Sequence, residues 1–167
     1  MFAEFLLYAV LIGIGATALF DLWSWLLKVA VGIPLPNWAM TGRWFAHLPR
    51  GRVMHREGIG KSPRVEGELA IGWLMHYVTG IVFAAALLLV WGVAWARLPT
   101  LGPALAVGWI TIACGWFILQ PALGLGVAAS RTPNPAKARV LNILGHTVFG
   151  LGLYETALLV DVLRVGA

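Results

Sequence analysis

Four long stretches of apolar residues dominate the pattern of this 167-residue chain. They cover approximately residues 5–27, 69–91, 103–129 and 140–163. A helix needs about 20 residues to cross a hydrocarbon core of about 30 Å, so each stretch is long enough to span a membrane. The stretches are continuous rather than alternating, and lipid requires every backbone amide to bond within its own segment. The pattern therefore predicts an all-α fold: one transmembrane domain, residues 1–167, built as an integral membrane four-helix bundle.

The composition points the same way. Hydrophobic residues make up 60% of the chain and charged residues 11%, and the mean hydropathy is +0.84. Soluble domains are about a quarter charged. The single cysteine, Cys114, excludes an intrachain disulfide, and its position inside the third stretch predicts a small buried side chain.

A net charge of +5 could indicate nucleic-acid binding, but the basic residues cluster at two connections between the apolar stretches. This distribution indicates the orientation of a membrane protein instead. Only Arg97 and Arg164 lie on the opposite side of the predicted membrane. The positive-inside rule predicts cytoplasmic basic connections and periplasmic termini. The clustered residues are Lys28, Arg43, Arg50, Arg52, Arg56, Lys61 and Arg64 at or within the first connection, and Arg131, Lys137 and Arg139 in the third.

The second and fourth stretches repeat one another. GWLMHYVTGIVFA, which contains His76, returns about seventy residues later as NILGHTVFGLGLY, which contains His146. A weaker match relates the first and third stretches, where Asp21 aligns with Gln120. We therefore expect two repeated helical hairpins. Identical pairs in the stronger match are Leu74 and Leu144, Val78 and Val148, Gly80 and Gly150, and residues 88–90 with 158–160.

Polar side chains within the stretches form the candidate site, a ligand or ion pathway. An unpaired carboxylate at such a depth costs free energy, so each polar group is expected to face the bundle and find a partner. Asn142 shares the helix face of His146, whereas Glu155 points away from it and indicates a subunit interface, a second internal surface, or a protonated group bonded to backbone. Internal hydrogen bonding without a site is the simpler interpretation of any one residue. The predicted set is Asp21, His76, Gln120, Asn142, His146 and Glu155.

The long first connection, residues 33–67, is expected to carry a short interfacial helix that begins after Asn37 as its N-cap. Around it lies a basic segment containing histidines. The simpler interpretation is a charged topology anchor, and the functional one is a lid or a site for anionic headgroups. The headgroup or loop residues would be Trp44, His47, Arg50, Arg52 and His55.

Three functions fit these features. The favoured one is a small transporter or channel-like protein that handles a proton, metal ion or small polar solute, with a break at Gln120-Pro121. The second is a b-type haem protein in which His76 and His146 are axial ligands and two glycines leave room for the macrocycle. The third is a non-catalytic membrane subunit or lipid-interacting protein. The expected partners in all three cases are membrane lipids, with anionic headgroups at the cytoplasmic face, and a second copy of the chain in a homo-oligomer is a further candidate; nucleic acid is not an expected partner. An enzyme is disfavoured because no H-E-x-x-H motif and no span-embedded serine with a base is evident.

The motifs GATALFDLWSW, NWAMTGRWFAHLPRGR, GWLMHYVTG, LQPALGLGVAASRTPNP and HTVFGLGLYE follow one another in this order. In these motifs, and over nearly its whole length, the chain resembles the bacterial membrane-protein family called domain of unknown function 2938. The resemblance implies a small four-span inner-membrane protein of a Gram-negative bacterium. It implies no activity, cofactor or substrate.

Overall fold

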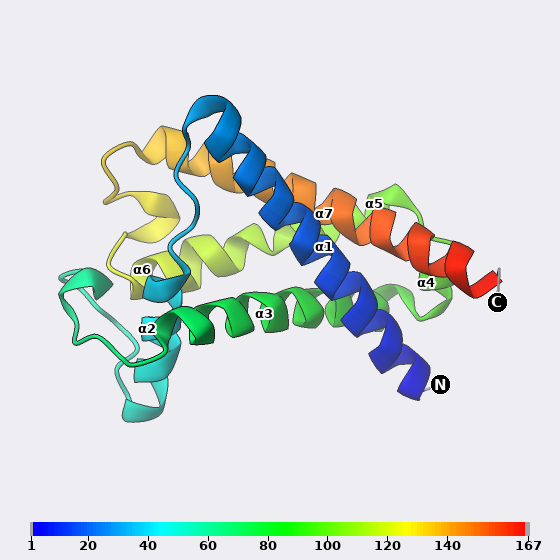
Figure 1. Ribbon diagram of the computed structural model, residues 1–167, viewed down its shortest axis with the longest axis horizontal. Coiled ribbons are helices and arrows are strands. Elements are labelled where there is room, and N and C mark those ends of the chain that lie inside the picture. Colours follow the sequence, from blue (N-terminus) through cyan, green and yellow to red (C-terminus); the bar gives the residue numbers. More distant parts are fainter. Residues whose placement is uncertain (1, 166–167) are drawn as a thin grey trace. The chain divides into compact units, whose positions relative to one another are not determined.

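The computed structural model describes residues 2–165, with side chains to residue 163; the side chain of Arg164 lies outside the described residues. Within this range every regular element is helical (Figure 1). Four helices are long and apolar enough to cross a membrane. They are α1 (Phe2–Val31), α3 (Glu68–Trp91), the third candidate span (Leu101–Ala122) and α7 (Pro135–Val165). Within α7 the candidate span is Pro135–Leu163. The all-α prediction is confirmed for the described residues.

The third candidate span is the irregular one. It consists of α5, Leu101–Ile110, a π-helical segment, Cys114–Leu119, and α6, Gln120–Ala122. The sequence predicts a break at Gln120-Pro121, whereas the structure places these two residues in α6 and the departure from α-helical bonding before them, at Thr111 and over Cys114–Leu119. The π-helical segment ends directly before Gln120, and Pro121 has no N–H to donate to it. The helix then ends at Ala122, earlier than the predicted residue 129. Gly124, with a φ of +85°, turns the chain where other residues would be strained.

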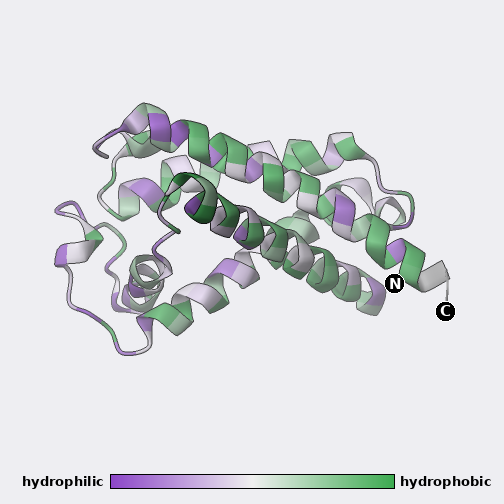
Figure 2. Cartoon of the chain, turned by 45° about the horizontal axis from the view of Figure 1, so that its top comes forward, coloured by the Kyte–Doolittle hydropathy of each residue, from purple (hydrophilic) through white to green (hydrophobic). Residues whose placement is uncertain are grey.

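Shorter elements fill the connections, which are mainly hydrophilic where the long helices are mainly hydrophobic (Figure 2). The predicted helix after Asn37 is present as α2, and the Asn37 side chain accepts a hydrogen bond from the backbone N–H of Met40 at 3.2 Å. This N-cap is therefore confirmed. The short elements are α2 (Trp38–His47), η1 (Leu48–Arg50), η2 (Ile59–Lys61), α4 (Ala94–Arg97) and η4 (Val127–Ala129).

The chain divides into two compact units. The bundle unit comprises the chain up to Leu35, Tyr77–Thr111, and the chain from Leu144 onward. The loop unit comprises Pro36–His76 and Ile112–Ile143. Helices α3 and α7 therefore contribute residues to both units, and His76 and His146 belong to different ones.

Glycines bring the helices of the bundle unit into close contact. A Cβ added to Gly13 of α1 would lie 2.5 Å from the Cα of Ile81 in α3, and one added to Gly108 of α5 would lie 2.5 Å from the carbonyl oxygen of His146 in α7. Backbones can approach this closely only where a side chain is absent. Around these contacts, Ile12 and Leu153 are fully buried. Helix pairs α1–α3 and α5–α7 thus pack through small residues.

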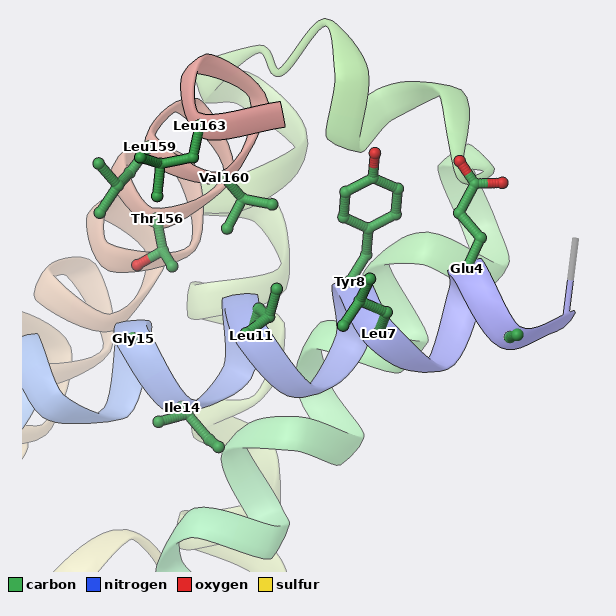
Figure 3. Close-up of a pocket in the computed structure, with 11 residues that line it drawn as sticks. Glu4, Leu7, Tyr8, Leu11, Ile14, Gly15, Thr156, Leu159, Val160 and Leu163 are labelled. Carbon is green, nitrogen blue, oxygen red and sulfur yellow. The ribbon is translucent and has the colours of Figure 1, made fainter. Parts of the chain in front are cut away.

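Helices α1 and α7 also pack closely, at a point where Gly15 lies against Thr156. Beside this point is a groove of about 710 Å³. Figure 3 shows Leu11 of α1 and Val160 of α7 on its two walls. The groove is almost wholly apolar, and none of the predicted polar site residues lines it. Its lining residues are Ala3, Glu4, Leu7, Tyr8, Leu11, Ile14, Gly15, Thr156, Leu159, Val160 and Leu163.

Candidate functional site

Asp21 on α1 has a partner that the sequence did not predict. The hydroxyl of Tyr77, on α3, donates a hydrogen bond to Asp21 Oδ2 at 3.1 Å. Both residues are partly buried in the bundle unit. The expectation that this carboxylate would find a partner is met by a phenol, which follows His76 directly in the sequence. A tyrosine beside a histidine in an apolar run was the available signal.

His146 on α7 bonds to the neighbouring helix α5 and the residue after it. Its Nδ1 lies 3.0 Å from the carbonyl oxygen of Gly108 and 3.1 Å from the hydroxyl oxygen of Thr111. A carbonyl can only accept, so Nδ1 carries the proton and Nε2 keeps its lone pair. The Thr111 hydroxyl donates to the same carbonyl at 2.8 Å. The protein therefore fixes one tautomer and one ring orientation.

His76 on α3 lies in the loop unit against the first residue of α2. Its ring stacks on Trp38 with centroids 3.8 Å apart and an interplanar angle of 24°. Trp73 meets it edge-on, with centroids 6.0 Å apart. The two histidines at equivalent positions of the repeat thus have different surroundings, one aromatic and one formed by backbone and hydroxyl oxygen. Their predicted convergence remains a prediction.

Gln120 and Asn142 are brought together in the loop unit. The Asn142 Oδ1 atom accepts hydrogen bonds from Gln120 Nε2 at 2.7 Å and from Trp116 Nε1 at 2.9 Å. The Oε1 atom of Gln120 is buried and has no hydrogen-bond partner in the described structure. A buried acceptor without a donor costs free energy. These three side chains, which we call the amide cluster, lie at the irregular end of the third candidate span.

Cys114 and Glu155 both lie on the surface of the predicted spans. Cys114 is exposed, so the prediction of a buried thiol is wrong. Phe117 and Ile118 of the same π-helical segment are also exposed. Glu155 is also exposed on α7, on the side away from His146. Its proposed role at a subunit interface stays a prediction.

The haem hypothesis requires open space beside Gly80 and Gly150, but neighbouring helices fill that space. A Cβ on Gly80 would lie 2.0 Å from Thr17 Oγ1, and one on Gly150 would lie 3.0 Å from the carbonyl oxygen of Ala104. A macrocycle needs open space at these positions. The helix packing therefore lends no support to haem bound there.

Several residues of the predicted headgroup site are buried in the loop unit. Trp44 is 8% exposed, and its Nε1 donates to the carbonyl oxygen of Val53 at 2.9 Å. His47 and His55 are 2% and 8% exposed. These three side chains are not displayed on the surface for a headgroup, because they pack inside the folded connection. Arg50 and Arg52 are exposed, as a headgroup site requires.

Arg43 of α2, which the sequence analysis counts only among the basic residues of the first connection, is 5% exposed. Its Nε and Nη2 atoms each lie 2.7 Å from a carboxylate oxygen of Glu68. Its Nη1 atom donates to the carbonyl oxygens of Ile59, Gly60 and Ser62 at 3.2, 3.4 and 3.2 Å. The hydrogen bonds to Glu68 raise the pKa of the Arg43 guanidinium. One side chain thus ties α2, the segment around η2, and the start of α3.

The same connection bonds to the end of the third candidate span. The backbone N–H of His55 donates to the carbonyl oxygen of Ala122 at 2.8 Å, and that of Ile59 donates to the carbonyl oxygen of Leu123 at 3.0 Å. Trp44, Ile59, Ala122 and Leu123 form a small apolar core beneath these bonds. Carbonyls at a helix end need donors from elsewhere. Residues 36–68 supply them, so the first connection is a folded cap on the loop-unit end of that span.

The described residues contain no group of three or more histidine, cysteine, aspartate or glutamate side chains that could hold a metal ion. The fold defines an all-helical protein with four long apolar helices, a composition compatible with a multi-pass membrane protein. More particularly, the chain belongs to the family described as Protein of unknown function (DUF2938), whose sequence model matches residues 10–160. No curated protein and no solved structure matches the chain.

Proposed function

We propose that this protein spans a membrane four times and lets a proton, metal ion or small polar solute pass at the broken third span. The observation that carries the proposal is the amide cluster of Trp116, Gln120 and Asn142, placed where α-helical bonding fails. Discontinuous spanning helices place backbone and side-chain polar groups within a membrane, and such breaks are where many transporters bind ions and solutes. The buried Oε1 of Gln120 adds an acceptor that a cation or a donor group on a solute could satisfy.

The polar groups of the bundle unit fit the same role. Asp21 with Tyr77, and His146 with Gly108 and Thr111, are hydrogen-bonded groups within apolar helices. Ionisable residues in spanning helices are rare and commonly mark a pathway. His146 retains a lone pair on Nε2, so it can accept a proton without breaking its bond to Gly108.

The packing supports an origin from two repeated hairpins. Gly80 of α3 contacts Gly13 and Thr17 of α1, while the equivalent Gly150 of α7 contacts Ala104 and Leu105 of α5. Each candidate hairpin is therefore joined at the same repeat position. A repeat unit with two spans keeps its orientation, which would relate the halves by an axis along the membrane normal.

We propose that the protein lies in a bacterial inner membrane, and the charge distribution supports an orientation with the basic connections in the cytoplasm and periplasmic termini. In this orientation the cap formed by the first connection covers the cytoplasmic end of the third span. The cap would act as a lid, and α2 would lie at the membrane interface.

Reconstituted vesicles test the transport proposal. We expect protein-dependent flux in vesicles that contain a pH-sensitive dye or a K⁺- or Zn²⁺-sensitive dye, under an imposed gradient. Asn142→Ala should reduce this flux, because it removes the acceptor shared by Gln120 and Trp116, and the double variant His76→Ala/His146→Ala tests the histidines. Leu144→Ala, an exposed apolar position two residues away, is the control. Flux that is equal in wild type, control and all of these variants would contradict the proposal.

A lipid-interacting subunit is the second candidate, because the outer surface of the cap remains basic. Its exposed cations would attract anionic headgroups by electrostatics and release them in salt. The purified protein should then bind phosphatidylglycerol, and the amount of this lipid that it binds should fall when these residues are replaced by glutamine. The exposed residues are Arg50, Arg52, Arg56, Lys61 and Arg64.

A further inference from the structure

Two buried histidines of the cap lie next to each other. His47 is the last residue of α2, and His55 lies in the segment that bonds to Ala122. Their side chains are 2% and 8% exposed, and their ring centroids are 5.4 Å apart at an interplanar angle of 52°. Neither residue takes part in the proposed transport pathway.

Each ring has one nitrogen held by the protein. The Nε2 atom of His47 lies 3.1 Å from the carbonyl oxygen of Pro63, which can only accept, so Nε2 carries the proton and Nδ1 keeps a lone pair. The Nδ1 atom of His55 lies 2.6 Å from the Ser62 hydroxyl. An outer partner of this kind is what orients a metal-binding imidazole and sets its tautomer.

The other nitrogen of each ring is buried and unpaired. His47 Nδ1 and His55 Nε2 have no hydrogen-bond partner in the described structure, although the two rings are neighbours. A direct bond between these nitrogens would satisfy both, but none is formed. Unpaired nitrogens on two neighbouring buried rings point to a partner that both rings could share, because each costs free energy when it is left without a partner.

We propose that His47 and His55 bind one late first-row transition-metal ion through His47 Nδ1 and His55 Nε2. Imidazole nitrogen suits copper and zinc. With metal–nitrogen bonds of about 2.0–2.1 Å, the ring centres of two imidazoles lie about 5 Å apart at a tetrahedral angle, and about 6 Å apart when both donors lie in line with the ion, as two-coordinate Cu⁺ prefers. The 5.4 Å separation of the His47 and His55 ring centres lies between these two values. The spacing of the two rings is therefore compatible with one shared ion.

The surroundings favour Cu⁺ over Zn²⁺. The described residues offer no third histidine, cysteine or carboxylate to complete the group, and Cu⁺ accepts two nitrogen donors, whereas Zn²⁺ takes four ligands in structural sites. The exposed Arg52 adds a positive charge to the same connection, and a cation repels a divalent ion more than a monovalent one. Arg43 contributes less repulsion because it is paired with Glu68.

Metal binding would also strengthen the cap. His55 donates its backbone N–H to Ala122 at the end of the third candidate span, and His47 ends α2. One ion on both rings would therefore fix two parts of the connection to each other beside that helix end.

The experiment uses purified full-length protein, stripped of metal and kept reduced without oxygen. Cu⁺ is titrated against a coloured Cu⁺ chelator, and Zn²⁺ is titrated separately. We expect one equivalent of Cu⁺ to bind, with Zn²⁺ binding at least tenfold more weakly. His47→Gln and His55→Gln should each weaken Cu⁺ binding at least tenfold, while His76→Ala/His146→Ala should leave it unchanged.

X-ray absorption of the wild-type 1:1 complex gives a second measurement that does not depend on a variant folding. Two imidazole ligands on copper are expected. Absence of stoichiometric Cu⁺ binding, or fewer than two imidazole ligands, would overturn the assignment. Loss of binding only in the His76→Ala/His146→Ala protein would also overturn it, and would place the metal in the proposed transport pathway.

Discussion

Removal of Arg43 offers the sharpest test of how the cap is held together. Arg43 makes two short hydrogen bonds to Glu68 and three longer ones to carbonyl oxygens, and its side chain is 7% exposed. In Arg43→Ala the Glu68 carboxylate, which is 15% exposed, keeps only the N–H of Val65 at 3.1 Å. Breaking one partner of a buried ion pair costs about 3–5 kcal/mol.

We expect a value near the lower end of that range, because the 15% exposure of Glu68 allows water to solvate part of its carboxylate. Hydrogen exchange resolved along the chain in detergent is the appropriate assay. Amides of residues 36–68 should lose protection, while amides at the centre of α1 should change little, since the loss is local to the loop unit.

The control is the ion pair between Lys61 and Glu57 in the same connection. Its atoms lie 3.9 Å apart and its side chains are 74% and 84% exposed, so Lys61→Ala should change protection very little. In the double variant Arg43→Ala/Glu68→Ala the cost should be smaller than the sum of the single variants, because each single variant leaves a buried charge unpaired. Strictly additive costs, or unchanged exchange in Arg43→Ala, would refute this account.

Three further predictions concern the spans. Gly80→Ala should lower the melting temperature in detergent, because its Cβ would lie 2.0 Å from Thr17 Oγ1. Gly115→Ala is the control and should be tolerated, because no atom lies within 4 Å of its Cβ. Equal melting temperatures for the two variants would contradict the packing at Gly80. Cys114, exposed within a proposed span, should react with a membrane-permeant maleimide in the folded, detergent-solubilised protein, and a thiol that such a reagent reaches only after denaturation would contradict its exposure. Asn142→Leu should lower thermal stability by about 1–3 kcal/mol through the donors it leaves unpaired, and an unchanged unfolding transition would argue against the amide cluster.

Much of the fold was predictable because it depends on local physics. A continuous apolar run can satisfy its backbone only as a helix in lipid, so four helices follow from the pattern alone. Asn37 was predictable as an N-cap because capping involves residues within one turn. An irregular third span near Pro121 was predictable because the missing N–H is a property of the residue itself, whereas the turn at Thr111 and the π-helical segment were not predicted.

The candidate site was predictable only in part. The sequence identified Gln120 and Asn142 as polar residues that need partners, and the structure brings them together. It did not identify Tyr77 as the partner of Asp21 or Trp38 as the neighbour of His76. These pairs are distant in the sequence, so no local period or spacing relates them.

The sequence by itself determined the long apolar helices, the family and the residues that could not remain unpaired in an apolar environment. Only the tertiary structure decided their partners, including the burial of Arg43 against Glu68 and of His47 beside His55. Helix formation is decided within a few residues of each backbone group. The environment of a polar side chain is decided by which distant segments pack around it, and the same arginine or histidine is stable at the surface or in the interior according to that packing.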